Sequence, residues 1–169
     1  MGIRYYAYAF DHELSDRALS DPRSLISSDP LADAWGLEPH SAVGYTTFEQ
    51  AVPERDLLYL DKAWRELQFM TGPRWPGAAA RPSFAMFEGE VVMGDTGWDP
   101  WVRPLLPESI PVIERDLAAL VDGDASRILR DFTGAENVEC RHATQYLRRA
   151  HEFVTGLVRD NRGMVYMIG

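Results

Sequence analysis

The chain has 169 residues, of which 46% are apolar and 25% charged, and its formal net charge is −9. This length and composition predict one folded domain spanning residues 1–169 and exclude a largely disordered chain. The single cysteine excludes an internal disulfide and a multi-cysteine zinc site, and the negative charge disfavours nonspecific binding to nucleic acid.

The amino-terminal part predicts a strand followed by weaker elements. Residues 2–10, GIRYYAYAF, are rich in the aromatic residues that strands favour, and Asp11 can cap a short helix after them. Residues 28–45 carry Pro, Gly and Ser at intervals, so we expect an irregular segment. The chain has neither a signal-peptide pattern at its start nor an apolar run long enough to span a membrane, which favours a cytoplasmic protein.

The middle of the chain predicts one helix and then a hairpin. Residues 55–72 show the clearest helical spacing, and Gly72-Pro73 is a typical end for such a helix. Residues 83–87 and 90–94 are expected to be two short strands around a Glu88-Gly89 turn. The apolar stripe of the helix consists of Leu57, Leu60, Trp64 and Leu67.

The carboxyl-terminal half predicts further amphipathic helices and a last strand. A helix should run from about Pro107 to Gly123, with Ile110, Ile113, Leu117 and Leu120 facing the core. A short helix over 124–134 and a long one over 137–163 follow, the latter closed by Gly163, and 164–169 should form a strand. Strands at both ends with helices between them predict an α+β fold with one mixed sheet of about four to six strands. We expect the terminal strand to lie inside this sheet, beside the first strand, because an apolar strand left unpaired promotes aggregation.

Three segments together resemble the YfbM-like family of bacterial domains of unknown function. They are MGIRYYAYAF at the start, LDKAWRELQFMTG at residues 60–72, and the stretch from GEVVMGDTGWDPWVRPLLPESI to the terminal strand. Trp98, Trp101 and the Pro/Ala-rich residues 72–82 depart from the family pattern. The resemblance implies a bacterial cytoplasmic α+β domain without established activity, some relatives of which are suggested to be immunity proteins against secreted toxins. It supplies no catalytic residues.

The loop expected at residues 94–103 holds most of the candidate site residues. Asp95 and Asp99 suit local turn chemistry, and they lack the further ligands of a calcium loop. Trp98 and Trp101 are expected either to pack inward on the core or to stack on Pro100 or Arg103; if exposed, they would form a recognition surface.

A second group of candidates lies in the predicted helix. Asp61 and Arg65 are spaced for an ordinary i,i+4 ion pair, and Trp64 should anchor the core. Asp61 beside Trp64 is alternatively a functional carboxylate at the rim of a pocket. The structural role is the more common one for both residues.

The remaining polar residues predict no metal site and no cofactor. The four histidines form no recognisable ligand set, and Cys140 and His142 point apart on a helix. Arg148 and Arg149, with other arginines nearby, could recognise phosphate or carboxylate groups, but interspersed acids make a solvated helix face the default.

Two functional hypotheses follow from the sequence. The first is a non-enzymatic interaction domain whose acidic, aromatic-containing surface binds a basic protein, with an immunity protein as its narrowest form. The second is a small-ligand-binding protein or enzyme with a pocket near Trp64, Asp95, Trp98, Asp99 and Arg103. An exposed tryptophan pair would equally suit a homodimer.

Overall fold

A computed structural model describes residues 2–37, 49–95, 97–125, 127–129 and 138–169. The strands are β1 (Tyr5–Asp11), β2 (Leu57–Asp61), β3 (Val92–Gly94), β4 (Gly97–Asp99), β5 (Trp101–Leu105) and β6 (Arg162–Ile168). The α-helices are α1 (Ser15–Ser20), α2 (Pro30–Trp35), α3 (Trp64–Thr71), α4 (Ile110–Ala119) and α6 (Val138–Asp160). Short 3₁₀ helices lie at η1 (His12–Leu14), η2 (Pro22–Leu25), η3 (Pro82–Met86) and η4 (Pro107–Ser109), and a π-helical turn, η5 (Leu120–Asp124), follows α4.

The main sheet has four strands in the order β2-β1-β6-β5. The two strands from the chain ends are neighbours, paired from Tyr5↔Ile168 to Asp11↔Arg162. This confirms the α+β class and the position of the terminal strand inside the sheet. Every pairing between the described strands of this sheet is antiparallel. The prediction of a mixed sheet is therefore wrong.

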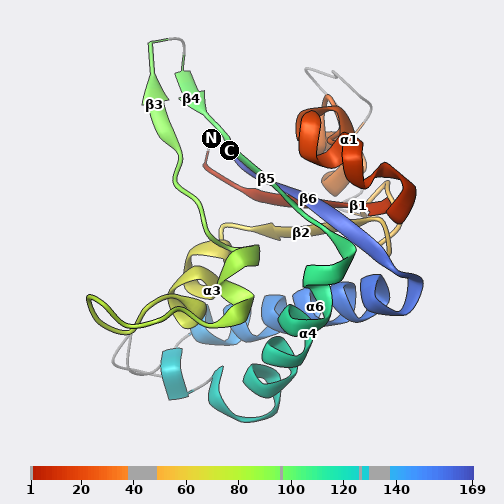
Figure 1. Ribbon diagram of the computed structural model, residues 1–169. Coiled ribbons are helices and arrows are strands. Elements are labelled where there is room, and N and C mark those ends of the chain that lie inside the picture. The colour runs from red at the N-terminus through yellow and green to blue at the C-terminus, as the bar shows by residue number, and fades with distance from the viewer. Residues whose placement is uncertain (1, 38–48, 96, 126, 130–137) are drawn as a thin grey trace.

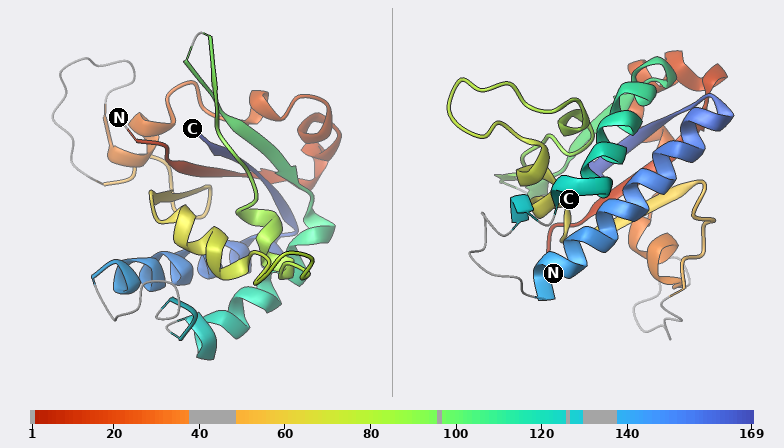
Figure 2. Two further views of the ribbon diagram at one scale, coloured as in Figure 1. Left: turned by 90° about the vertical axis from the view of Figure 1, so that its left-hand side faces the viewer. Right: turned by 90° about the horizontal axis from the view of Figure 1, so that it is seen from below.

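Both faces of this sheet are covered by helices. α3, α4 and α6 pack on one face, and α1 and its neighbours lie against the other (Figures 1 and 2). Along β1, Tyr5 and Ala7 contact the larger core, whereas Tyr6, Tyr8 and Phe10 contact the smaller clusters on the opposite face. Burial on both faces explains why β1 and β6 read as nearly continuous apolar runs.

The prediction of one helix over residues 55–72 is wrong in its first half. Leu57–Asp61 is the edge strand β2, and α3 begins only at Trp64. The chain turns between them at Asp61, whose φ of 47° is left-handed. All four stripe residues are buried, as expected. The spacing of these apolar residues does not distinguish the two structures, because a strand that is buried on both faces is a continuous apolar run and contains the same positions as the apolar stripe of a helix.

Three other boundaries differ from the sequence-based expectation. The first strand of the predicted hairpin, residues 83–87, is wrong, because residues 82–86 form the 3₁₀ helix η3. The hairpin of the structure begins with β3 at Val92. Within the supposedly irregular 28–45 segment, α2 forms because the Asp29 side chain caps it, accepting from the Ala32 amide at 3.1 Å. Residues 38–45 lie outside the described part. α6 ends at Asp160, and Gly163 belongs to β6.

The predicted apolar stripe of α4 is confirmed. For α6 the sequence predicts a stripe of Tyr146, Leu147, Ala150, Val154, Leu157 and Val158, and four of these six residues are buried. Ile110, Ile113, Leu117 and Leu120 are buried along α4 and its extension. In α6, Leu147, Ala150, Val154 and Leu157 are buried, while Val158 at the edge of the stripe is 39% exposed. The described part of the predicted 124–134 helix is helical at 125 and 127–129. None of the helices among the described residues is long and apolar enough to cross a membrane.

Two buried tyrosines attach η3 to the sheet. The Tyr5 and Tyr166 rings stack with centroids 5.4 Å apart. The Tyr5 hydroxyl donates to the Met86 carbonyl at 2.8 Å, and the Tyr166 hydroxyl donates to the carbonyls of Ala85 and Glu88 at 3.0 and 2.6 Å. Burial raises the pKa of Tyr5 well above 10 and that of Tyr166 to about 12. These phenols satisfy carbonyls that the short helix leaves free.

Gly163→Ala should destabilise the protein by about 1–3 kcal/mol, because the close approach of β6 to its neighbours leaves no room for a methyl group. A Cβ at this position would lie 2.7 Å from the Leu105 carbonyl oxygen and would also overlap the Phe10 ring. Gly123→Ala is the matched control, since an added Cβ there has nothing within 4 Å. Urea unfolding of both variants measures the difference, and equal free energies would contradict the packing described.

The protein should lose stability as the pH rises above 10. Burial raises the pKa of Tyr6 and of Tyr166 to about 12, whereas tyrosines of the unfolded chain ionise near 10.0. Below pH 10 neither state has lost these protons, and the stability is fully present. Between 10 and 12 the unfolded chain releases them first, so the free energy of unfolding falls. Denaturant unfolding across this range measures the slope, which Tyr6→Phe should reduce; an unchanged slope in that variant would contradict the assignment.

Candidate functional site

The segment predicted as a loop at 94–103 is mostly strand. β3 and β4 form a separate two-stranded hairpin, paired Val92↔Asp99, Met93↔Trp98 and Gly94↔Gly97. This hairpin projects from the body on the side opposite α4 and α6 (Figures 1 and 2). Pro100 alone separates β4 from β5, so the hairpin is a continuation of the sheet edge.

The hairpin exposes large apolar side chains. Val92 and Met93 are each 60% exposed, and Trp98 is 56% exposed. Trp101 is 36% exposed and lies over Gly89, where an added Cβ would come within 2.6 Å of the indole ring. The expectation that both tryptophans pack inward is therefore wrong for Trp98 and only partly met for Trp101. The strands β3 and β4 extend beyond the body, which agrees with the exposure of these side chains (Figure 1).

The root of the hairpin is fixed to the body. The Gln68 side-chain amide on α3 donates to the carbonyls of Phe87 and Gly89 at 2.8 and 3.0 Å. Arg103 on β5 forms an ion pair with Glu88. Gln68 thus holds the segment that leads into β3, and the Arg103–Glu88 pair joins that segment to β5, so the root of the hairpin is attached to the body.

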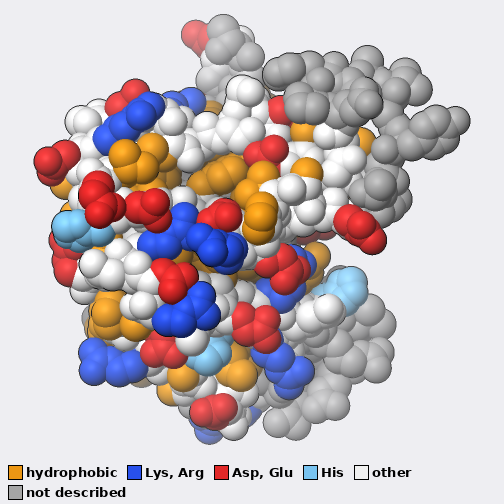
Figure 3. Space-filling model, turned by 90° about the vertical axis from the view of Figure 1, so that its right-hand side faces the viewer, with side chains coloured by type: hydrophobic (Ala, Val, Ile, Leu, Met, Phe, Trp, Pro, Cys, Tyr) orange, Lys and Arg blue, Asp and Glu red, His pale blue; other side chains and the backbone are white. Residues whose placement is uncertain are grey.

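The hairpin is acidic as well as apolar. Glu90, Asp95 and Asp99 are exposed on or beside its strands. Asp99 makes one long contact, 3.5 Å from Arg23, and both side chains are largely in solvent, so this pair contributes little. On the face shown in Figure 3, by contrast, acidic and basic side chains lie next to one another. The hairpin is thus a place where one sign of charge accompanies exposed apolar groups.

Asp61 and Trp64 occupy a different place, at the corner between β2 and α3. Asp61 does not pair with Arg65; it accepts from Arg4 Nε at 3.1 Å and from the Tyr59 hydroxyl at 3.0 Å. The predicted i,i+4 ion pair is wrong because Asp61 ends a strand. Trp64 is 6% exposed, which confirms it as a core residue. The seven sequence candidates therefore fall into two groups, five at the hairpin and its root and two at this corner.

A groove that the sequence did not indicate lies between α6 and the edge strand β2. Its cavity volume is about 1240 Å³, and its walls come from α2, residues 49–55, β2 and α6. None of the seven candidates lines it. Trp35, Tyr59, Tyr146 and Arg149 do, and Arg149 was noted in sequence only as part of an arginine-bearing helix face. The signal was absent because the groove joins segments about ninety residues apart in the chain.

The described residues offer little to a metal ion. Within the ranges that the structure describes, no group of three or more His, Cys, Asp and Glu side chains is close enough to hold one. His151 on α6 instead pairs with Glu114 on α4, Nε2 to Oε1 3.1 Å. His40 and the Cys140 side chain fall outside the described part.

The chain matches no known family model, no curated protein and no solved structure. The resemblance to the YfbM-like family therefore stays a prediction.

Trp64→Ala and Trp98→Ala should differ sharply in their effect on stability. Removing the buried Trp64 ring should lower the free energy of unfolding by about 3–5 kcal/mol, because it leaves a cavity in the core. Removing the exposed Trp98 ring should change it by less than about 0.5 kcal/mol. Guanidinium unfolding monitored by circular dichroism makes the comparison. A large loss in Trp98→Ala would mean that its ring does close the core.

Proposed function

We propose that this chain is a protein-interaction module that uses the β3–β4 hairpin to bind a basic protein. The observation that carries the proposal is the exposure of Trp98, Met93 and Val92 on an acidic element whose root is fixed. Large aromatic side chains dominate the binding energy of protein interfaces, and Trp98 is such a side chain with more than half of its surface exposed.

The attachment of the hairpin at its root supports a role in binding. Isolated hairpins with such short strands are marginal in water, and this one is held by the Gln68 contacts and by its continuity with β5. A partner would therefore meet a hairpin already oriented for contact, which lowers the entropy cost of association. The acidic side chains would speed the approach of a basic partner.

The narrower versions of the proposal depend on the family resemblance. In an immunity-type role, the basic partner is a toxin, and the chain acts in the bacterial cytoplasm. A small-ligand or enzymatic role at residues 94–103 has less support, because the described groove lies elsewhere and none of those residues lines it. A homodimer formed through Trp98 is an alternative occupant of the same surface.

Trp98→Ala should weaken binding of the basic partner about thirtyfold or more, as expected for a central aromatic residue. The partner is first identified by pull-down from the source cells, then purified, and its affinity is measured by surface plasmon resonance. Trp75→Ala is the matched control, since Trp75 is 67% exposed but lies on the loop after α3.

Neutralising the hairpin acids should act on a different quantity. The triple variant Glu90→Gln, Asp95→Asn, Asp99→Asn should lower the association rate and its dependence on salt, with a smaller effect on dissociation.

A partner that binds Trp98→Ala and Trp75→Ala equally well would refute the proposal. Sedimentation showing a dimer that Trp98→Ala dissociates would replace it with self-association.

A further inference from the structure

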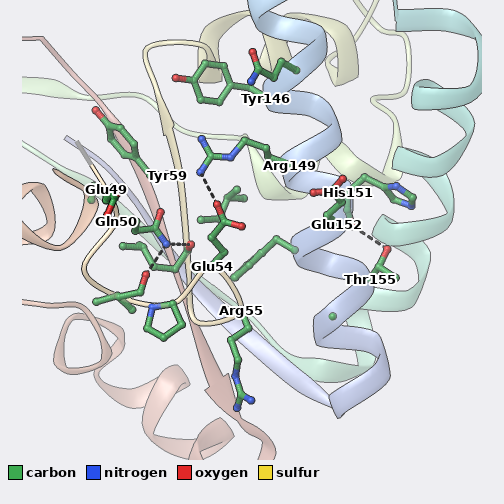
Figure 4. A pocket seen from close by; sticks show the side chains of 18 of the residues that line it. Glu49, Gln50, Glu54, Arg55, Tyr59, Tyr146, Arg149, His151, Glu152 and Thr155 are labelled. Atoms are coloured by element: carbon green, nitrogen blue, oxygen red, sulfur yellow. Dashed lines mark hydrogen bonds and ion pairs between the residues drawn. The ribbon is translucent and has the colours of Figure 1, made fainter. Parts of the chain in front are cut away.

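The groove between α6 and β2 contains a cation whose present partner holds it weakly. Arg149 extends from α6 toward Glu54 on the opposite wall (Figure 4). Arg149 Nη2 and Glu54 Oε1 are 3.7 Å apart, and the Glu54 side chain is 81% exposed. This separation is too long for a hydrogen bond, and an ion pair so exposed contributes little. Arg149 is therefore available to a stronger anionic partner.

Arg149 is nevertheless kept in position. Its guanidinium lies over the ring of Tyr146, one turn earlier on α6, with 5.8 Å between Cζ and the ring centroid. Its side chain is 34% exposed, so it is partly buried and still accessible to a ligand. A guanidinium held in this way presents its planar fork to a carboxylate at a small entropy cost.

The rest of the groove supplies apolar surface. Trp35, Pro53, Tyr59 and Phe153 are among the lining residues. The wall opposite α6 is fixed by Gln50, whose side-chain amide donates to the carbonyls of Val52 and Leu57 at 2.8 and 2.9 Å. The groove is thus formed before any ligand arrives. Apolar surface beside polar groups that can fix a ligand's orientation is typical of sites for organic molecules.

The charges within the groove limit the ligand. Three acidic side chains, Glu49, Glu54 and Glu152, line it together with Arg149, Arg55 and Arg159. Arg55 and Arg159 are paired with the neighbouring Asp56 and Asp160, so a polyanion such as a phosphate ester would find Arg149 as its cation and would meet repulsion from the glutamates. His151 is directed away from the groove, toward Glu114. The site therefore suits a single negative charge, and the histidine among its described lining residues, His151, is paired with Glu114.

We propose that this groove binds a single carboxylate carried on an apolar body, with Arg149 pairing with the carboxylate in place of Glu54. Tyr146 positions the guanidinium, and the aromatic walls contact the apolar body. A free organic acid and the carboxyl terminus of a peptide share this chemistry. The proposal is independent of the hairpin.

The test is a set of NMR titrations of the whole protein with four probes. These are 4-phenylbutyrate and the peptide acetyl-Gly-Gly-Phe, each compared with its neutral amide. We expect the carboxylates to shift the Trp35 indole and the amides of α6, and the neutral amides to bind at least about tenfold more weakly, as loss of a charge-assisted hydrogen bond predicts. Whichever carboxylate binds more tightly identifies the source, free acid or peptide terminus.

Three variants separate this site from an ordinary surface ion pair. Arg149→Gln should weaken carboxylate binding about tenfold, because it removes the paired cation. Glu54→Gln should strengthen it about two- to threefold, because it removes the competing carboxylate. Arg148→Gln is the matched control: Arg148 is exposed on the same helix but does not line the groove, and its loss should change nothing.

The outcomes divide cleanly. Tighter binding to Glu54→Gln together with weaker binding to Arg149→Gln supports the proposal. Equal affinity for acids and amides, an equal effect of Arg148→Gln and Arg149→Gln, or no binding of either carboxylate to Glu54→Gln would overturn it. Glu54→Gln alters one exposed side chain, so it remains informative even if Arg149→Gln fails to fold.

Discussion

The hydroxyl groups of Tyr5 and Tyr166 make the contacts on which the arrangement of this molecule depends. Both residues lie in the two central strands, and their hydroxyls satisfy carbonyls of residues 85, 86 and 88. Leaving a buried carbonyl without a hydrogen-bond partner costs about 1–3 kcal/mol of folding free energy. The tyrosine hydrogen bonds therefore favour one position of η3 against the sheet. Because the chain passes directly from η3 to the hairpin, the same contact determines where the hairpin begins.

The sheet order also keeps the two candidate sites apart. The groove lies along β2, one edge strand, and the hairpin continues β5, the other edge strand. Between them lie β1 and β6, each buried on both faces. A ligand bound in the groove would therefore not directly contact the residues that form the hairpin, and a partner bound to the hairpin would not directly contact the groove. Each can be tested by itself, and a partner at the hairpin would leave the groove open.

Much of the core was predictable from the sequence, whereas its geometry was not. Leu57, Leu60, Trp64 and Leu67 are all buried, as their apolar character requires, but only the last two lie on a helix. Spacing alone cannot separate a strand that is buried on both faces from a helix, and a left-handed Asp61 in the middle is not signalled by the pattern. The terminal strand was placed correctly because an unpaired apolar strand is costly in any fold.

The sites show the same limit more strongly. The sequence points to residues 94–103 as the segment with most of the candidate site residues. It predicts that the two tryptophans there lie inside, because burial is the usual state of such rings. Whether a hairpin rests on the body or extends from it depends on contacts at its root, such as those of Gln68, which are distant in sequence. The groove could not be foreseen at all, since it exists only where α6 passes the edge strand.

The prolines of the β4–β5 ribbon have a consequence for self-association. Pro100 precedes β5, and Pro104 lies within it; among the described strands of the main sheet, β5 pairs with β6 on one side only. Proline has no N–H to donate, so it interrupts any ladder that a strand from another molecule would form along this edge. The outer edge of β5 is thereby protected against fibre-like polymerisation by strand addition.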